Sequence, residues 1–423
     1  MYYNKLAPDR SSRLASSLSL GLSRELWLVE AGIFLNMLGY GAVLPFEIIY
    51  LHDGRGFSLS VAGLVVGTIT GVAVLAAPLA GPAIDRFGAR VTATVAGVAL
   101  AVGYAGLAFA RSPGQAFAAA ALAGAGNGAL NPSQSTLLVT LAPPDRRHRA
   151  TAVSRVAGNA GIGIGGALGG LVAARGLTGF VVLFLANAVT YLVYVCVLVA
   201  VVREAARPEP VRGGYRQVAR DRQFVRLVVI NVAMIAVGWG VFSWLVPPYA
   251  ENYLGVGAPA IGLLLLANAA TVVVAQVPVA RLAEGRRRGV MIALAASIFA
   301  ACCLLVVAAG AGIGAGAAYA ALVVACVAVG VGECCYTTVL TPLVADLAPS
   351  GLRGRYLAAM GSAWWIGLAA APTLGVQLLS RSPAAAFLTA GAAAAACAMS
   401  ALTLGRRLPA AARLTPRPGG TPG

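Results

Sequence analysis

Charged residues are scarce in this chain. Only 11% of its 423 residues are Asp, Glu, Lys or Arg, whereas 59% are hydrophobic, and soluble domains carry about 25% charged residues. The mean hydropathy of +0.83 agrees with that shortage. An ordinary soluble protein is therefore excluded. The sequence indicates a membrane protein, in which the many small residues, 52 of them glycine, suit close contacts between helices.

The chain is also poor in residues that catalyse reactions or bind metals. It has 2 His, both outside the apolar runs, and 7 Cys, all inside them, with no Cys-x-x-Cys pair. Cysteines in apolar segments behave as small hydrophobic residues. The Gly-x-Gly strings also lie in apolar helices rather than after strands, so they do not predict a dinucleotide site. We expect no metal site, no cofactor and no enzymatic activity.

Basic residues outnumber acidic ones by 31 to 14, which gives a net charge of +17. They lie in short loops between apolar runs, without the aromatic platform or recognition motif of a nucleic-acid-binding domain. Nucleic acid is therefore excluded as a partner. The first 24 residues lack the short apolar core and cleavage site of a signal peptide, so the first membrane helix is expected to act as the targeting signal.

Long apolar runs define the expected architecture. A helix that spans a lipid bilayer needs about 20 apolar residues, and the chain holds twelve such runs. They cover residues 27–50, 60–84, 91–110, 114–138, 151–173, 179–202, 226–249, 258–283, 290–310, 314–341, 357–378 and 383–404. The sequence predicts an all-α membrane protein with twelve transmembrane helices. The predicted parts are an N-terminal segment (1–26), a six-helix half (27–202), a linker (203–225), a second six-helix half (226–404) and a tail (405–423).

The loops between these runs differ in charge from one side of the membrane to the other. Of the 31 Lys and Arg residues, 26 fall in the termini, the linker and the alternate loops that share their side, and 4 fall in the remaining loops. Loops rich in Lys and Arg stay in the cytoplasm. Both termini and the linker are therefore predicted to be cytoplasmic, which requires an even number of spans.

The two predicted halves resemble each other. Asp85 follows Gly63 by 22 residues, and Glu284 follows Gly262 by the same spacing. A second match pairs Gly124-Ala125-Gly126-Asn127 with Gly330-Val331-Gly332-Glu333. Because both halves have the same topology, this is a parallel repeat about an axis along the membrane normal, and transporters bind substrate near the midplane between such repeats.

The segment from Gly81 to Arg90 is expected to be the short charged turn between the second and third helices. Its sequence resembles the signature of the major facilitator superfamily in that loop, with matches at Gly81, Asp85, Arg86, Gly88 and Arg90. The resemblance implies the major facilitator fold and secondary active transport by alternating access. Gly332-Glu333, followed by Asp346-Leu347-Ala348-Pro349 and Arg353-Gly354-Arg355-Tyr356, also resembles bacterial drug-exporter-like members. That resemblance implies a multi-pass, monomeric protein of the bacterial cytoplasmic (inner) membrane with a small-molecule substrate.

The resemblance also implies a gate. Asp85 can interact with the positive N-terminal end of a helix from the other half, here the predicted helix that begins near Leu357. Glu284 would do the same for the helix at 151–173. These contacts would hold the cytoplasmic side closed and would break when that side opens. The alternative is a solvated polar turn.

The predicted helix at 151–173 carries glycine every fourth residue, at Gly161, Gly165 and Gly169. Such a stripe lets another helix approach closely. The stretch resembles the antiporter motif of the superfamily, except that Gly166 stands where that motif has proline. Drug exporters of the superfamily also carry an arginine at the place of Gly124. These departures leave both export and uptake open.

Two acidic residues inside apolar runs are candidates for proton coupling, Glu333 and Glu47. An ionised carboxylate at the bilayer centre costs about 2.5–3.5 kcal/mol on insertion scales, so such residues usually face a cavity and have a function. Desolvation disfavours the charged form, and alternating access would let the carboxyl group bind and release a proton. Glu30, at the other end of the first helix from Glu47, is expected to lie at the membrane interface.

Nine further polar or aromatic residues within the runs are candidates for lining a substrate cavity: Asn36, Tyr40, Asn127, Asn131, Asn231, Trp239, Asn268, Gln276 and Tyr336. The leading hypothesis is a proton-coupled exporter of a small lipophilic or cationic compound. An uptake symporter or facilitator for a small metabolite is the alternative. A non-transporting membrane sensor is a third reading, and it would need no cavity.

The gate hypothesis predicts the effect of Asp85→Asn. Loss of the charge should slow transport through the opening and closing cycle, because the contact with the helix end weakens. Substrate affinity should stay nearly unchanged, because the turn lies far from the expected cavity. Transport rates and equilibrium binding measured on the same preparation would separate the two effects, and a large loss of affinity would contradict the gate.

Overall fold

A computed structural model describes residues 23–142, 147–202, 215–312, 314–349 and 353–415. These residues form helices almost throughout, with one isolated backbone bridge between Arg287 and Leu414. All-helical structure is the physical expectation for a chain in lipid, because a helix satisfies its own backbone hydrogen bonds. The central linker, between residues 203 and 214, lies outside the described part.

The N-terminal half consists of six long helices, which we number in chain order. They are helix 1 (α2 Arg24–Val43, η1 Leu44–Phe46, α3 Glu47–Ile49 and η2 Tyr50–Gly54), helix 2 (α4, Leu59–Phe87), helix 3 (α5, Ala89–Phe109), helix 4 (α6, Pro113–Leu141), helix 5 (α7, Arg147–Ala173) and helix 6 (α8, Leu177–Val201).

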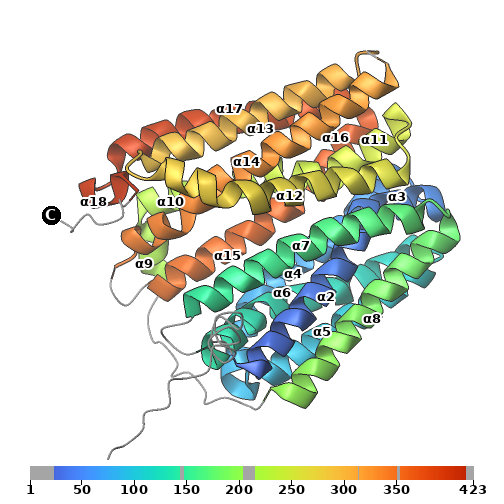
Figure 1. Ribbon diagram of the computed structural model, residues 1–423, viewed down its shortest axis with the longest axis horizontal. Coiled ribbons are helices and arrows are strands. Elements are labelled where there is room, and N and C mark those ends of the chain that lie inside the picture. Colours follow the sequence, from blue (N-terminus) through green and yellow to red (C-terminus); the bar gives the residue numbers. More distant parts are fainter. Residues whose placement is uncertain (1–22, 143–146, 203–214, 313, 350–352, 416–423) are drawn as a thin grey trace, which may run out of the picture.

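The C-terminal half repeats this order. It consists of helix 7 (α10 Arg222–Ile235, η3 Ala236–Leu245 and α11 Val246–Leu254), helix 8 (α12, Ala258–Ala283), helix 9 (α13, Arg288–Ala309), helix 10 (α14, Ala315–Leu347), helix 11 (α15 Arg353–Ala370, η4 Ala371–Gly375 and α16 Val376–Arg381) and helix 12 (α17, Pro383–Arg407). Two short helices, α9 (Tyr215–Arg220) and α18 (Ala410–Arg413), lie beside it at one end of the bundle (Figure 1).

The predicted twelve-helix architecture is confirmed. Within the described ranges, 11 of these helices are long and apolar enough to cross a membrane. The remaining one is helix 4, whose sequence from Asn131 to Ser135 reads Asn-Pro-Ser-Gln-Ser. Its polarity has a structural reason, because Asn127 and Asn131 line an internal cavity.

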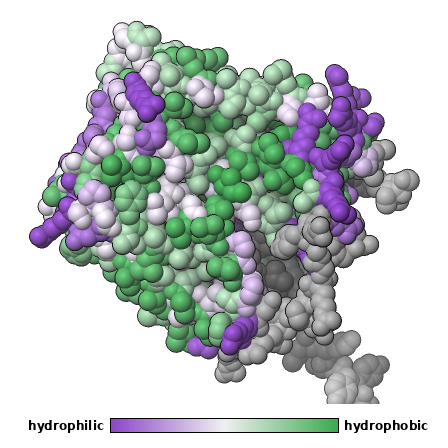
Figure 2. Space-filling view, turned by 180° about the vertical axis from the view of Figure 1, so that it is seen from behind, coloured by the Kyte–Doolittle hydropathy of each residue, from purple (hydrophilic) through white to green (hydrophobic). Residues whose placement is uncertain are grey.

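The surface has the pattern of a membrane protein. Figure 2 shows a broad hydrophobic band with hydrophilic residues gathered at two opposite ends of the molecule. Helices 1, 5, 7, 9 and 11 begin with arginine and helix 12 ends with arginine at one of these ends, which we call the basic end. The loops after helices 1 and 11 form part of the opposite end, and the band between the two ends is the part that lipid would surround.

The junction between helices 2 and 3 is shorter than predicted. Helix 2 continues to Phe87, so most of the expected turn is helical, and Gly88 alone connects it to helix 3. Gly88 has φ of 87°, a left-handed conformation that glycine adopts without the Cβ clash of other residues. The corresponding turn between helices 8 and 9 is longer and places Gly285 at φ of 70°.

Helices 1, 7 and 11 are interrupted within the bundle. Pro45 lies in the 3₁₀ turn of helix 1, and Pro372 lies in a π-helical turn of helix 11. Helix 7 contains a longer π-helical stretch, Ala236–Leu245, which ends just before Pro247. Proline removes a backbone donor and clashes with the preceding turn, so these breaks follow from the sequence.

The two halves meet at the opposite end. Helix 5 packs along helix 8, where a Cβ on Gly166 would lie 2.9 Å from the Cβ of Leu265. Helix 2 packs along the end of helix 11, where the Ser60 and Ser380 hydroxyl oxygens are 3.1 Å apart. Figure 1 shows helices 5 and 8 (α7 and α12) side by side between the halves.

The predicted glycine stripe of helix 5 lies against helix 1. A Cβ on Gly161 would come within 2.8 Å of the Phe34 carbonyl oxygen, and Cβ atoms on Gly165 and Gly169 would collide with the backbone at Leu38 and Ala42. The absence of side chains therefore sets the distance between these two helices. This packing lies within the N-terminal half.

We expect Gly161→Ala to destabilise the protein. Alanine favours a helix over glycine by about 1 kcal/mol, yet its methyl group would force helices 1 and 5 apart. Gly158→Ala is the matched control, because a Cβ on Gly158 meets no atom within 4 Å. Thermal unfolding of detergent-purified protein should show a lower midpoint for Gly161→Ala alone. Equal midpoints for the two variants would contradict this account of the packing.

Candidate functional site

A cavity lies between the two halves and has two lobes, which share Trp239 of helix 7 and Trp364 of helix 11. The larger lobe has a volume of about 600 Å³ and contains Glu333, and we call it the acid lobe. The smaller has a volume of about 380 Å³ and is lined by asparagines, and we call it the amide lobe. Both volumes fall in the range of small-molecule sites.

The acid lobe extends toward the basic end. Its wall includes Arg155, near the start of helix 5, and Val277, near the end of helix 8, and both side chains are exposed. At the opposite end, by contrast, helices 5 and 8 are in close contact at Gly166 and Gly262. The cavity is therefore accessible from the basic end and closed at the opposite end.

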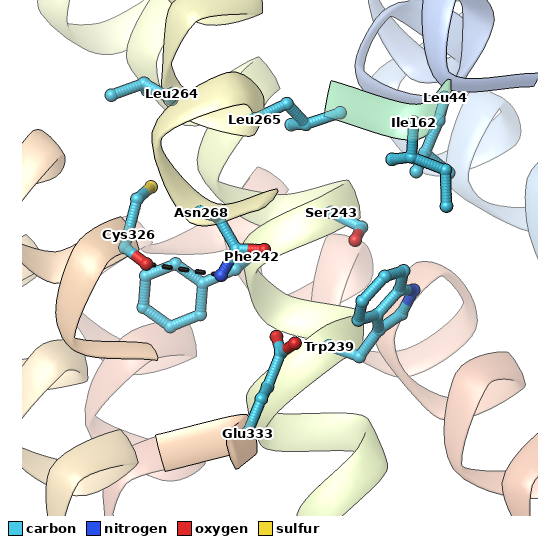
Figure 3. A pocket seen from close by; sticks show the side chains of 10 residues that line it. All are labelled: Leu44, Ile162, Trp239, Phe242, Ser243, Leu264, Leu265, Asn268, Cys326 and Glu333. Atoms are coloured by element: carbon cyan, nitrogen blue, oxygen red, sulfur yellow. Dashed lines mark hydrogen bonds between the residues drawn. The ribbon is translucent and has the colours of Figure 1, made fainter. Parts of the chain in front are cut away.

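Glu333 lies deep in the acid lobe, at the edge of a further pocket of about 30 Å³. Figure 3 shows its carboxyl group pointing into this pocket, between Trp239 and Asn268. The Asn268 amide nitrogen donates to the Cys326 carbonyl oxygen at 3.2 Å, which holds the amide beside Glu333. Apolar groups, including Phe242 and Leu265, complete the surroundings of this pocket.

The amide lobe is polar on one face and aromatic on the other. Helices 1 and 4 contribute Asn36, Tyr40, Asn127 and Asn131, and helices 7 and 11 contribute tryptophans. Neither amide atom of Asn36 has a hydrogen-bond partner within the protein. Because buried amides normally have partners, Asn36 is available to a ligand. The repeat mates Asn127 and Glu333 lie in different lobes.

Of three other predicted cavity residues, two line the acid lobe and the third lies behind it. Gln276 lines this lobe and donates to the Thr338 hydroxyl at 3.1 Å. Tyr336 also lines it, and its hydroxyl donates to the side-chain amide oxygen of Asn231 at 2.6 Å. Asn231 lines neither lobe. It is buried behind Tyr336, so its role is to hold that side chain.

Glu47 lies outside both lobes, in the contact between the halves. One carboxylate oxygen accepts from the Tyr104 hydroxyl of helix 3 at 3.0 Å, and the other accepts from the Trp244 indole nitrogen of helix 7 at 3.1 Å. Only 2% of its surface is exposed. Glu47 therefore bonds to both halves at once. We call the hydrogen bond between Trp244 and Glu47 the cross-half bond.

Glu30 is buried, contrary to the expectation that it lies at the membrane interface. Only 2% of its surface is exposed. The reason is the position of helix 1, which is packed between helices 5 and 6 of the same half, so that one face of it meets protein along its whole length. Sequence hydropathy does not reveal which face this is.

The residues of the predicted gate lie at the basic end. Gly81 and Arg86 are exposed in the last turns of helix 2, and an Arg90 guanidinium nitrogen donates to the Val199 carbonyl oxygen at 2.7 Å. Glu284 is exposed and caps helix 8. The side chain of Asp85 lies outside the described part, so its contact with helix 11 stays a prediction.

The sequence did not reveal several of the contacts that shape the site. Trp364 and Trp365 both line the amide lobe, although nothing in their apolar run distinguishes them. An ion pair joins Arg288, only 1% exposed as a side chain, to Asp346 at 2.7 Å, and it links the start of helix 9 to the end of helix 10. The sequence offered two signals for this ion pair: Arg288 stands next to the predicted start of a helix, and Asp346 stands in the predicted loop that follows another.

The family model of the Major Facilitator Superfamily matches residues 30–246 and again residues 228–422. The chain belongs to the Major Facilitator Superfamily. It is therefore a multi-pass membrane protein, as the sequence predicts, and its family is one of transporters rather than enzymes. Among the described residues, no group of three His, Cys, Asp or Glu side chains could hold a metal ion.

The chain is similar to two bacterial proteins over part of its length. An uncharacterized MFS-type transporter of Bacillus subtilis, YttB, is 27% identical over 262 residues, which cover 60% of this chain and 64% of that protein. The multidrug resistance protein MdtH of Aeromonas hydrophila is 30% identical over 217 residues, which cover 48% and 51%. The matches thus span between half and two thirds of the length of these relatives.

Solved structures show the same fold. A POT peptide transporter superposes with a TM-score of 0.74 at 19% identity and covers 91% of this chain and 94% of its own. A D-xylose–proton symporter superposes with a TM-score of 0.71 at 16% identity, covering 91% and 98%. At such identity the likeness concerns the fold alone.

We expect Trp244→Phe to loosen the contact between the halves at the opposite end, because phenylalanine keeps an aromatic ring but cannot donate to Glu47. Hydrogen bonds to charged groups contribute about 1.5–3 kcal/mol, which corresponds to roughly tenfold or more in an equilibrium. Tyr104→Phe is the matched control, because it removes a bond to Glu47 within one half.

The readout is a disulfide between Ser60→Cys and Ser380→Cys, whose hydroxyl oxygens are now 3.1 Å apart across the halves. In a background without native cysteines, Trp244→Phe should slow its formation by up to about tenfold, because the lost hydrogen bond lowers the fraction of protein in which this end is closed. Tyr104→Phe should leave the rate near that of the parent. Equal rates in all three proteins would show that the cross-half bond does not hold this end closed.

Proposed function

We propose that the protein exports a small lipophilic or cationic compound in exchange for protons. The observation that carries this proposal is the position of Glu333, an acidic side chain in the wall of a large cavity between two repeated halves. A carboxyl group in such surroundings binds a proton readily, because desolvation disfavours its charged form. The same group can attract a cationic substrate when it is ionised.

The rest of the acid lobe supports a lipophilic substrate. Phe299, Trp239, Trp364 and several valines line it, and aromatic and aliphatic side chains bind apolar groups by removing them from water. Aromatic faces also attract cations. The multidrug resistance proteins among the relatives agree with this substrate class.

The charge distribution supports a proposed orientation in the membrane. The arginine-rich basic end would face the cytoplasm, by the positive-inside rule, with both termini on that side of a bacterial inner membrane. The cavity would then be open to the cytoplasm. Substrate enters the acid lobe from there, and the protein acts as a monomer, because each chain encloses a complete cavity.

The proposed cycle couples substrate to proton at Glu333. Substrate binding from the cytoplasm displaces the proton from Glu333. The halves then rock about the cavity, the cross-half bond at Glu47 breaks, and the opposite end opens. Substrate leaves, Glu333 takes up a proton from outside, and the halves return. Asp85 and Glu284 close the cytoplasmic end in the outward-facing state, and Glu47 is a second proton-binding candidate there.

Uptake of a small metabolite is the second candidate, and the amide lobe favours it. Asn36, Asn127 and Asn131 present neutral hydrogen-bonding groups, which suit a polar solute better than a lipophilic cation. Helix 5 has Gly166 where the antiporter motif has proline, and helix 4 has Gly124 in place of the exporters' arginine. Accumulation of radiolabelled solutes in whole cells separates uptake from export.

We expect Glu333→Gln to abolish proton coupling. Glutamine keeps the shape of the side chain but cannot exchange a proton. In proteoliposomes with an imposed pH gradient, the wild-type protein should concentrate a dye or drug against its gradient. The variant should fall to the background rate, while Glu333→Asp should retain part of the activity, because it keeps a titratable group.

Glu25→Gln is the control for altered net charge, since Glu25 is exposed at the basic end. Full gradient-driven flux in Glu333→Gln would overturn the coupling role. Flux that does not respond to the pH gradient in the wild-type protein would overturn proton-coupled export itself.

A further inference from the structure

A third acid inside the bundle lines neither lobe of the cavity and takes no part in the proposed cycle. Glu30 of helix 1 is 2% exposed, and neither of its carboxylate oxygens has a hydrogen-bond partner. Glu47 is equally buried but accepts two hydrogen bonds. The difference calls for an explanation, because a buried carboxylate without a partner is among the most costly groups in a protein.

The surroundings of Glu30 are polar but uncharged. Ser154 of helix 5 and Tyr194 of helix 6 are both near enough to act electrostatically on the Glu30 carboxylate. Gln134 of helix 4 lies beside Tyr194. The Tyr194 hydroxyl and the Gln134 amide nitrogen also lack partners, although the two residues are only 0% and 6% exposed.

Four helices thus each bring one polar side chain to the same place. The ionisable group that faces Glu30 from a neighbouring helix is Tyr194, which is neutral in its usual state. Arg155 follows Ser154 in sequence but lines the acid lobe instead. Among the side chains that the structure describes, no Lys or Arg pairs with Glu30, so none of these residues neutralises the carboxylate.

We propose that Glu30, Gln134, Ser154 and Tyr194 form a binding site for one small cation, a proton or a sodium ion. A proton would convert Glu30 into a neutral acid that can donate to a neighbouring oxygen. A sodium ion would be held by the carboxylate together with hydroxyl and amide oxygens, the ligands that hard cations prefer. Either cation removes the cost of burying the charge.

The site would fix the basic-end half of helix 5 to helix 1. Ser154 belongs to the site, and the next residue, Arg155, lines the acid lobe. Occupancy therefore stabilises the N-terminal half and the part of the cavity wall built on helix 5. This inference is independent of Glu333, and either proposal can fail without the other.

Thermal unfolding of the purified full-length protein tests the site. Midpoints are measured from pH 6 to pH 9 in sodium chloride and in choline chloride of the same concentration, for wild type, Glu30→Gln and Glu25→Gln. Glutamine is neutral and needs no cation. A ligand bound only by the folded state raises the midpoint, and a shift of about 2 °C or more is measurable for a protein of this size.

The sign of the expected effect follows from linkage. A proton bound in the folded state is lost as the pH rises, so stability that depends on it falls with rising pH. In choline chloride, the wild-type midpoint should therefore fall between pH 6 and pH 9 relative to that of Glu30→Gln. Glu25→Gln should follow the wild type, because Glu25 is exposed five residues before Glu30 in the same helix.

The two salts distinguish the cations. A midpoint restored at pH 9 by sodium but not by choline assigns a sodium ion, whereas the same loss in both salts assigns a proton. Parallel curves for wild type and Glu30→Gln in all conditions overturn the site. So does a uniform loss of stability in Glu30→Gln, which would mean that the charged carboxylate itself is stabilised by the protein.

Tyr194→Phe provides a milder variant if Glu30→Gln does not fold. It removes one hydroxyl from the site and keeps the ring that packs against Gly32. It should weaken the dependence of the midpoint on pH or sodium relative to wild type. An unchanged dependence would count against the assignment of Tyr194 and of the site.

Discussion

The cost of placing an ionised or unpaired polar group in an apolar environment governs this structure. It requires each membrane span to be a helix, because lipid offers no partner for the backbone. It also confines most of the charge to the two ends of the molecule (Figure 2). The few acids inside the bundle therefore need specific surroundings. Glu333 faces a cavity, Glu47 accepts two hydrogen bonds, and Glu30 has no hydrogen-bond partner among the described residues.

A second constraint is how closely helices can approach. Within the N-terminal half, Gly161, Gly165 and Gly169 let helix 5 lie directly on helix 1. Between the halves, close contacts at the opposite end include those at Gly166, Gly262 and Ser60. The two kinds of contact have different consequences. The first makes a half that can move as one body, and the second makes an interface that can open.

Much of the fold followed from sequence patterns. Apolar runs of the right length predicted the twelve helices, and the matched spacing of Asp85 and Glu284 predicted the repeat. The turn after helix 2 was predicted too long, because hydropathy marks where apolar residues stop rather than where the helix ends. Asn127 and Asn131 were candidates for the cavity because polar residues are rare in such runs. Trp364 carried no such signal, since tryptophan is ordinary in a membrane helix.

The sequence by itself determined the number, length and pairing of the helices, because these depend on local hydropathy and on a repeat that can be read along the chain. Only the tertiary structure decided which polar side chains meet. Glu30 and Glu47 lie on one helix, yet Glu47 joins Tyr104 and Trp244 from two halves, whereas Glu30 faces Tyr194 within one. The rotation of each helix about its axis and the breaks at proline and glycine set those contacts, and neither is encoded in hydropathy.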